Sequence, residues 1–464
     1  MPDRPNVVFM LADNLGYGDV GCFGSAGEQR GMPTPNLDRL ADGGLRLNQF
    51  LVEAACTPSR AALLTGRYSI RTGLSLITVP GGHELGADEF TLGDLFKRAG
   101  YRTIYYGKWH LGASTETEPQ YHGFDEWRLG FYGSSDGTLY GDNISRTHGP
   151  AALHDRNVIQ IREADTPRTP STELHPYDLA YRRKIDNAMT DAAIDYITGN
   201  ASSDTPFFLF MGITRPHYPN LPSDEFLGAS RIGNYGDCIM ELDHNVGRIL
   251  DAIDTAQITQ DTIVVFVSDN GPTTTSTLPD EIFMASAGPW RGELGDPWEG
   301  SIRTVGMLRW PGHITPGVSE QMVAIMDLLP TFATLLDTDL PDDRPIDGVD
   351  QSAHLFNGQT QSNRDHLLTF IGGALTAVRW HQWRIYTANY HPSSTNPSLG
   401  GYMGHSNPTA GYPMAFNIEA DPREQRNVMA ENGWVIDPFM QHVGAYRASL
   451  KNHPNPPAAN LTDF

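Results

Sequence analysis

The chain has 464 residues and carries 33 Lys and Arg against 55 Asp and Glu, a formal net charge of −22. This acidic balance argues against a nucleic-acid-binding protein, which needs clustered basic residues to neutralise phosphates. No apolar run approaches the roughly 20 residues that a membrane-spanning helix requires, and three cysteines are too few for a disulfide framework. The first residues lack the basic and apolar regions of a signal peptide. We therefore expect a globular protein without nucleic-acid or membrane partners, cytoplasmic as the sequence stands unless a leader has been removed.

Four short apolar segments are each followed by polar residues. The segments span residues 6–11, 101–106, 207–213 and 262–268, and they are rich in β-branched and aromatic residues. This composition is typical of strands buried on both faces of a parallel sheet. The polar residues that follow them include Asp13, Asn14, Lys108, His110, His217, Asp269 and Asn270.

Helical patterns lie between these segments. Residues 35–41 begin with Pro35 after Thr34, a potential capping residue. Residues 186–197 and 241–253 repeat apolar side chains at helical spacing. The alternation predicts an α/β fold with a mostly parallel central sheet flanked by helices. Since ligands bind beyond the carboxyl ends of such strands, we expect the polar residues there to share one site.

The two Asp-Asn pairs at these strand ends offer only oxygen ligands. Asp13, Asn14, Asp269 and Asn270 therefore suit a hard cation such as Ca²⁺ or Mg²⁺ better than a structural Zn²⁺. Taken singly, each pair is better explained as the start of a turn. Their matched positions favour a shared cation site.

The segment from Cys56 to Arg67 reads Cys-Thr-Pro-Ser-Arg-Ala-Ala-Leu-Leu-Thr-Gly-Arg. Pro58 suits a first helical turn, so Cys56 is expected near a helix N-terminus, where the dipole and free N–H groups favour an anion. Spacing alone does not distinguish this role from a small buried thiol.

Ordered motifs over nearly the whole chain resemble those of the type I, formylglycine-dependent sulfatases, arylsulfatase-like members of the alkaline phosphatase superfamily. The most specific match is Cys56-Thr-Pro-Ser-Arg60 with Leu64-Thr-Gly-Arg67. Further matching segments are Ala12–Asp19, Gly107–Gly112, Ser268–Gly271, Trp298–Arg303, Arg309–Gly312 and Phe416–Pro422. The resemblance implies an alkaline-phosphatase-like fold and hydrolysis of aryl or carbohydrate sulfate monoesters to alcohol and inorganic sulfate.

The resemblance also implies a mechanism. A separate maturation enzyme would oxidise Cys56 to formylglycine, whose hydrate attacks sulfur and later releases sulfate by collapsing to the aldehyde. A divalent cation, Ca²⁺ in the first place and otherwise Mg²⁺ or Mn²⁺, would be held by the four oxygen ligands and by residue 56. The expected roles of the other residues are to hold the hydrate (Arg60), to stabilise charge on the sulfuryl group (Lys108), to assist collapse (His110) and to protonate the leaving oxygen (His217).

Two positions depart from the family pattern. Asn14 stands where the family usually has a second Asp, and Leu294 stands where a sulfate-contacting Lys is common. One anion and one cation are lost together, so we expect the net charge of the site to be preserved. Arg215 and Arg291 are candidates to replace the missing cation.

The sequence pattern changes near residue 363. Short alternating segments at 367–371, 377–380, 383–386 and 414–418 predict a small antiparallel sheet with a packed helix. We therefore divide the chain into a catalytic α/β domain (1–362) and a C-terminal subdomain (363–464) that ends in a Pro-rich tail over the surface.

Other interpretations remain open at this point. A phosphonate or phosphate ester hydrolase could use the same scaffold. A non-catalytic sulfoester-binding relative would account for Asn14 and Leu294, but the intact Cys56, Arg60, Lys108, His110 and His217 argue against it. The aromatic residues near the motifs either line an aryl or sugar pocket or pack the core: Trp109, Trp127, Phe131, Tyr132, Tyr218 and Trp298.

Overall fold

The computed structural model describes residues 4–24, 30–78, 82–153, 158–273, 285–391, 405–408 and 413–457. Its main element is a sheet of eleven strands in the order β11-β2-β10-β8-β1-β7-β3-β4-β5-β6, with β9 paired to β2. The strands are β1 (Asn6–Asp13), β2 (Leu45–Leu51), β3 (Arg102–Lys108), β4 (Glu126–Phe131), β5 (Gln160–Ala164), β6 (Thr172–Pro176), β7 (Phe207–Pro216), β8 (Thr262–Ser268), β9 (Arg303–Thr304), β10 (Gly306–Arg309) and β11 (Gly317–Ala324). Within these residues, no helix is both long and apolar enough to cross a bilayer.

The four apolar segments form four consecutive strands of this sheet, in the order β8-β1-β7-β3. Every pairing among them is parallel, and β1, β7 and β8 are buried along almost their whole length. The carboxyl ends of the four strands therefore meet at one edge, as predicted. Antiparallel pairs occur on either side of this parallel centre, where β10 joins β8 to β2 and where β5 joins β4 to β6.

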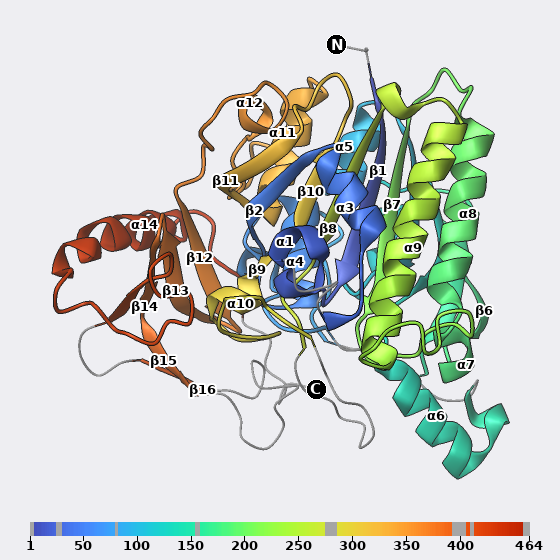
Figure 1. Ribbon diagram of the computed structural model, residues 1–464, viewed down its shortest axis with the longest axis horizontal. Coiled ribbons are helices and arrows are strands. Elements are labelled where there is room, and N and C mark those ends of the chain that lie inside the picture. Colours follow the sequence, from blue (N-terminus) through green and yellow to red (C-terminus); the bar gives the residue numbers. More distant parts are fainter. Residues whose placement is uncertain are drawn as a thin grey trace.

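Helices cover both faces of the sheet (Figure 1). One core contains residues of α3 (Pro35–Asp42), α8 (Ile185–Asn200) and α9 (Asn234–Thr255), and the other contains residues of α4 (Cys56–Thr65), α5 (Leu92–Arg98) and α11 (Leu328–Leu335). Further α-helices of this part are α1 (Gly21–Gly24), α6 (Gly137–His148), α7 (Leu179–Arg182), α10 (Glu299–Ile302) and α12 (Ser352–Leu355). Short 3₁₀ turns span Tyr17–Asp19, Ser69–Thr72, Thr115–Thr117, Pro119–Tyr121, Pro150–Leu153, Thr259–Asp261, Ile325–Asp327 and Gly433–Val435.

The start of α3 differs from the expected side-chain cap. Thr34 is the N-cap residue, but its hydroxyl accepts from the N–H of Gly21 and makes no capping bond within α3. The carboxylate of Asp243, on α9, accepts from the N–H groups of Asn36 and Leu37 instead. A tertiary contact thus satisfies the helix terminus that a local side chain was expected to satisfy.

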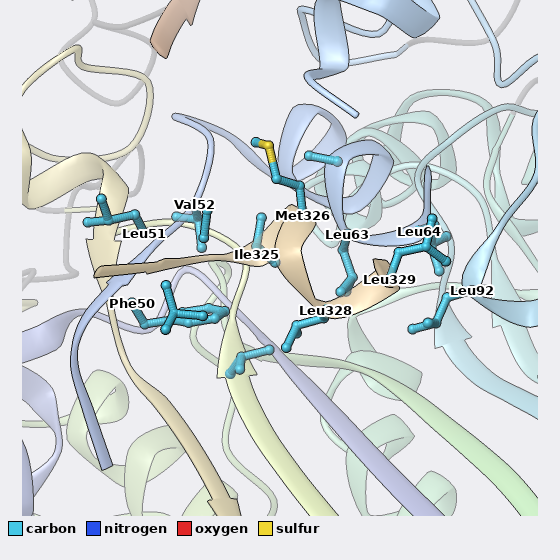
Figure 2. Packing of buried hydrophobic residues seen from close by; sticks show 14 of the residues in the cluster. Phe50, Leu51, Val52, Leu63, Leu64, Leu92, Ile325, Met326, Leu328 and Leu329 are labelled. Atoms are coloured by element: carbon cyan, nitrogen blue, oxygen red, sulfur yellow. The ribbon is translucent and has the colours of Figure 1, made fainter. Parts of the chain in front are cut away.

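The core on the α4 face fixes the helix that begins at Cys56. Figure 2 shows Leu63 and Leu64 of α4 beside Leu328 and Leu329 of α11. Phe50 and Leu51 of β2 belong to the same cluster. These side chains are almost completely buried. Because apolar burial contributes about 25 cal/mol per Å², this packing holds α4 in a single position against the sheet.

The C-terminal part contains the predicted antiparallel sheet, with the order β12-β13-β14-β17. Its strands are β12 (His366–Ile371), β13 (Ala374–Trp380), β14 (Trp383–Tyr386) and β17 (Met414–Asn417), and α14 (Ile436–Ser449) packs on it (Figure 1). A separate hairpin joins β15 (Ala388–His391) and β16 (His405–Pro408). The domain division at residue 363 stays a prediction, as does the course of the tail.

An ion pair joins the first residues of this C-terminal part to the 3₁₀ turn that precedes α11. Arg364 donates from Nε and Nη2 to the carboxylate of Asp327 at 2.5–3.0 Å, and both side chains are buried. Its other N–H groups reach the carbonyls of His366 and Asp347. Arg364 therefore connects three separate segments.

We predict that Arg364→Met lowers the free energy of unfolding by about 3–5 kcal/mol, because it leaves a buried carboxylate without its partner. Arg426→Met is the matched control, since Arg426 pairs with Glu431 at 3.6 Å on the exposed surface and such pairs contribute about 0–1 kcal/mol. Urea unfolding followed by circular dichroism measures both changes. Equal effects of the two substitutions would contradict the buried role of Arg364.

Candidate active site

The carboxyl edge of the parallel strands brings the expected side chains together. Asp13 ends β1 and Lys108 ends β3, while His217 and Asn270 follow β7 and β8 within two residues. Asn14 and His110 adopt positive φ angles of 64° and 60°, a conformation that is uncommon for residues other than glycine. The N–H of Asn14 donates to Asp269 Oδ1 at 3.1 Å, which holds this turn in place.

Two buried ion pairs form the centre of the site. Lys108 Nζ lies 2.7 Å from Asp13 Oδ2, and Arg60 donates to Asp269 Oδ2 at 2.9 and 3.0 Å. All four side chains are almost completely inaccessible to solvent. Burial opposes ionisation of Asp13, but the charges of Lys108 and Arg60 lower its pKa below the ordinary value. Burial and the charge of Asp13 raise the pKa of Asp269 to about 6.

Cys56 is the first residue of α4, and its thiol lies beside Asp13, the last residue of β1, and Asn14, the next residue. Its Sγ lies 3.5 Å from Asp13 Oδ1 and 3.6 Å from Asn14 Oδ1. Burial raises the pKa of this thiol despite the nearby charge of Lys108, so the unmodified side chain is a neutral thiol. The loop before α4 is fixed by a bond from the N–H of Gly295 to the carbonyl of Ala54 at 2.7 Å.

The oxygen atoms at this edge fit a hard cation. Asn270 donates from Nδ2 to Asn14 Oδ1 at 2.7 Å, which places both amides beside Asp13. Asn270 Oδ1 is buried, and among the described residues it has no hydrogen-bond partner. A buried acceptor without a donor is costly unless a ligand satisfies it. One donor atom each of Asp13, Cys56 and His217 also lies within 4.8 Å of the others.

His217 is linked to Lys108 through a serine that the sequence did not single out. Ser134 Oγ lies 2.8 Å from His217 Nε2 and 3.3 Å from Lys108 Nζ. The Nδ1 atom of His217 lies 2.6 Å from the carbonyl of Tyr218, which requires a proton on Nδ1. Neutral His217 therefore accepts at Nε2 from the Ser134 hydroxyl, which itself accepts from Lys108. Burial lowers the pKa of His217 below its ordinary value.

His110 is held by its backbone. Its carbonyl accepts from Thr57 Oγ1 at 3.0 Å, while its Nδ1 is buried and has no hydrogen-bond partner within the described part of the chain. Burial and the charges of Lys108 and Arg60 lower its pKa well below the ordinary value. The imidazole is therefore neutral and has a free nitrogen.

Arg215 and Arg291 were expected as possible replacements for the missing Lys. That expectation is wrong for both residues, because each is bound elsewhere in the structure. Arg215 is buried and pairs with Asp186 and Glu241. Arg291 stacks on Trp298, 3.7 Å from the ring centroid, and donates to the carbonyl of Glu424. The expectation rested on sequence proximity to the motifs, whereas buried carboxylates and an aromatic face bind these guanidinium groups.

Four of the six aromatic residues near the motifs divide into two groups. Trp109, Trp127 and Phe131 are completely buried and belong to the hydrophobic cores. Tyr218 stacks on His217, with ring centroids 4.7 Å apart. Core packing thus explains the first group, whereas Tyr218 lies directly against the site.

The geometry of this site agrees with the comparison of the chain with known proteins. The sulfatase family model matches residues 5–338. The chain belongs to the sulfatase family. It is 32% identical to human steryl-sulfatase, over 91% of this chain and 84% of that protein, and 34% identical to bovine arylsulfatase A, over 95% and 86%. As the names of these relatives indicate, it is a sulfuric ester hydrolase.

Solved structures of sulfatases share the fold. The PsFucS1 sulfatase from Pseudoalteromonas sp. superposes with a TM-score of 0.86 and 27% identity, covering 98% of this chain and 92% of that one. The phosphonate monoester hydrolase of Agrobacterium radiobacter has a TM-score of 0.62 at 20% identity. The second likeness concerns the fold alone, and the sulfatase family is the one to which the chain is assigned.

We predict that Ser134→Ala lowers kcat on a sulfate ester about fivefold and leaves KM nearly unchanged, because one hydrogen bond of about 1 kcal/mol that orients Lys108 and His217 is lost. The pH dependence of kcat should also shift, which a purely structural substitution would not cause. Ser135→Ala is the matched control, since the neighbouring Ser135 contacts the hydroxyl of Tyr177 instead. Identical kinetics for the two variants would contradict the positioning role of Ser134.

Proposed function

We propose that the protein hydrolyses aryl or carbohydrate sulfate monoesters through a formylglycine at position 56 and a divalent cation. The observation that carries the proposal is the position of the Cys56 Sγ, 3.5 Å from Asp13 Oδ1 at the start of α4. A side chain at this position lies beside Asp13 and Asn14, and the charges of Lys108, Asp269 and Arg60 also act on it. The names of its relatives, among them steryl-sulfatase and arylsulfatase A, support a sulfate ester as the substrate.

The hydrated aldehyde explains why the site needs a modified residue. One geminal hydroxyl attacks sulfur and gives its proton to Nε2 of neutral His217. The ester S–O bond breaks, and the alcohol leaves with that proton from His217. The second hydroxyl then loses its proton to the free nitrogen of His110, the bond between the formylglycine carbon and the sulfate oxygen breaks, and inorganic sulfate and the aldehyde form. Water restores the hydrate. A cysteine or serine would remain sulfated, because neither has a second hydroxyl to expel the group.

The proposed cation would be held by Asp13, Asn14, Asp269 and Asn270, together with the modified residue 56. When bound, it would supply positive charge that favours ionisation of the attacking hydroxyl and attracts the sulfate. Asp269 is also bound by Arg60, which in turn donates to the carbonyl of Lys108 at 3.0 Å. These contacts support a role for Arg60 in holding the hydrate and for Lys108 in binding a sulfate oxygen.

The proposed function is tested by comparing ester classes after coexpression with a formylglycine-generating enzyme. We expect kcat/KM for 4-nitrophenyl sulfate to exceed that for its phosphate and phosphonate analogues, and Cys56→Ala to abolish turnover. Cys22→Ala is the control, since Cys22 lies in α1. Preference for the phosphonate would favour the alternative hydrolase on this scaffold.

Chelation tests the cation separately. We expect thorough treatment with EDTA to abolish turnover and Ca²⁺ or Mg²⁺ to restore it, because every strand-end ligand is an oxygen donor. Asp269→Asn should lose bound metal together with activity, measured by elemental analysis. Asp251→Asn, on the exposed surface, should lose neither. Full activity in metal-free protein would contradict the cation site.

Asn14 and Leu294 lie at the two ends of a short chain of contacts. Asn14 donates from Nδ2 to Thr273 Oγ1 at 3.0 Å, and the carbonyl of the preceding Pro272 accepts from the N–H of Leu294 at 2.8 Å. Leu294 is buried. The two departures from the family pattern thus share one segment, which supports their proposed compensation.

We predict that Asn14→Asp and Leu294→Lys each lower kcat/KM and that the double substitution recovers part of the loss. Asn14→Asp adds a charge beside the proposed cation and sulfate, where Coulomb energies reach roughly several kcal/mol. Leu294→Lys alone buries an ammonium among groups adapted to leucine. The four-member cycle is measured with one sulfate ester. Strict additivity would show that the two departures are independent.

A further inference from the structure

A second group of metal-ligating side chains lies in the C-terminal part and shares no residue with the catalytic site. Asp365 and His366 stand at the beginning of β12, and His442 lies in α14. One ligand atom from each of the three lies within 4.8 Å of the other two. We propose that Asp365, His366 and His442 form a binding site for a transition-metal dication such as Zn²⁺, which joins α14 to the sheet.

The hydrogen bonds among the three side chains are incomplete. His366 Nδ1 lies 2.7 Å from Asp365 Oδ1, a hydrogen bond, whereas His442 Nε2 lies 4.0 Å from Asp365 Oδ2, beyond hydrogen-bonding distance. The two imidazole rings stack with centroids 3.8 Å apart and planes 21° apart. Two rings thus direct a nitrogen toward one carboxylate that binds only one of them. A cation among the three atoms would be bound by all of them.

The three side chains supply donor atoms that a divalent metal binds. A carboxylate oxygen of Asp365 and one imidazole nitrogen each of His366 and His442 lie within 4.8 Å of one another. Metals bind the ionised carboxylate and the neutral imidazole, so metal binding competes with protonation of these groups.

The ligand types distinguish this site from the catalytic one. Two imidazoles and a carboxylate suit Zn²⁺, Co²⁺ or Ni²⁺, while the oxygen set at the strand ends suits Ca²⁺ or Mg²⁺. The side chains of His366 and His442 are 31% and 17% exposed, so an ion reaches the group from solvent and water can complete its coordination. On binding, the proton of His366 Nδ1 moves to Nε2, and no other bond changes.

Because His442 lies in α14, an ion bound to it would affect the packing of that helix. The same helix buries Phe439, Val443 and Tyr446 in the core, and Tyr446 packs edge-on against Tyr68 with ring centroids 6.3 Å apart. Tyr68 follows α4, the helix that begins at Cys56. A metal between β12 and α14 would therefore stabilise the side of the molecule that supports the nucleophile helix.

The test uses the whole protein saturated with Ca²⁺ and titrated with Zn²⁺ by calorimetry. We expect the protein to bind one Zn²⁺ per chain at this group and to melt at a higher temperature when zinc is bound. In the double variant His366→Gln/His442→Gln, we expect the affinity for Zn²⁺ to fall about tenfold or more. The reason is that loss of metal ligands weakens binding at least as much as loss of the contacts that support them. His244→Gln, an exposed histidine in α9, is the matched control.

Diffraction at the zinc edge tests the position independently of whether the variants fold. An anomalous peak between His366 and His442 is the expected result. Zinc found at the Asp13, Cys56 and His217 group only, or no peak at all, would overturn the proposal. An unchanged titration in the folded double variant would overturn it as well.

Discussion

The pairing of two buried carboxylates with two buried cations at one edge of the sheet is the interaction on which the rest of the site depends. Asp13 and Asp269 are withdrawn from water where β1 and β8 end, and Lys108 and Arg60 balance their charge. Removal of one partner from a buried pair costs about 3–5 kcal/mol, because the remaining charge stays desolvated. The folded chain therefore keeps this edge electrically balanced while it leaves carboxylate and amide oxygens directed at Cys56.

The surrounding fold supplies the rigidity that this charge arrangement needs. The four central strands fix the positions of Asp13, Lys108 and the residues after β7 and β8, and the apolar packing of α4 fixes Cys56 (Figure 2). A buried network in the C-terminal sheet contributes from the other side. Arg384 donates to Glu299 at 3.2 Å, and Glu299 begins α10, next to the segment that binds the loop before Cys56. The small sheet thus supports the active-site loop although it contains none of the proposed catalytic residues.

Much of this architecture could be predicted from the sequence because its signals are local. Strands buried on both faces have continuous apolar sequences. Polar residues directly after such strands indicate the edge of the sheet where ligands bind. The C-terminal strands were predicted from their alternating pattern. The other strands of the large sheet were not predicted. Among them, β9 and β10 have only two and four residues and carry no pattern of their own.

The features that sequence did not predict depend on contacts between distant segments. Ser134 lies in a Gly-Ser-Ser-Asp-Gly loop that reads as an ordinary turn, although its position after β4, at the same edge, is a signal that could have revealed it. The cap of α3 by Asp243 and the pairing of Arg215 with Asp186 and Glu241 join residues far apart in the chain. No local motif encodes such partners.

The central claim is that residue 56 acts as a formylglycine within this charge arrangement. Peptide mass spectrometry of active protein, coexpressed with a formylglycine-generating enzyme, tests it most directly. The peptide containing residue 56 should carry the aldehyde or its hydrate, and the modified fraction should rise in proportion to sulfatase activity across preparations. Full activity in a preparation whose residue 56 is entirely an unmodified thiol would contradict the account.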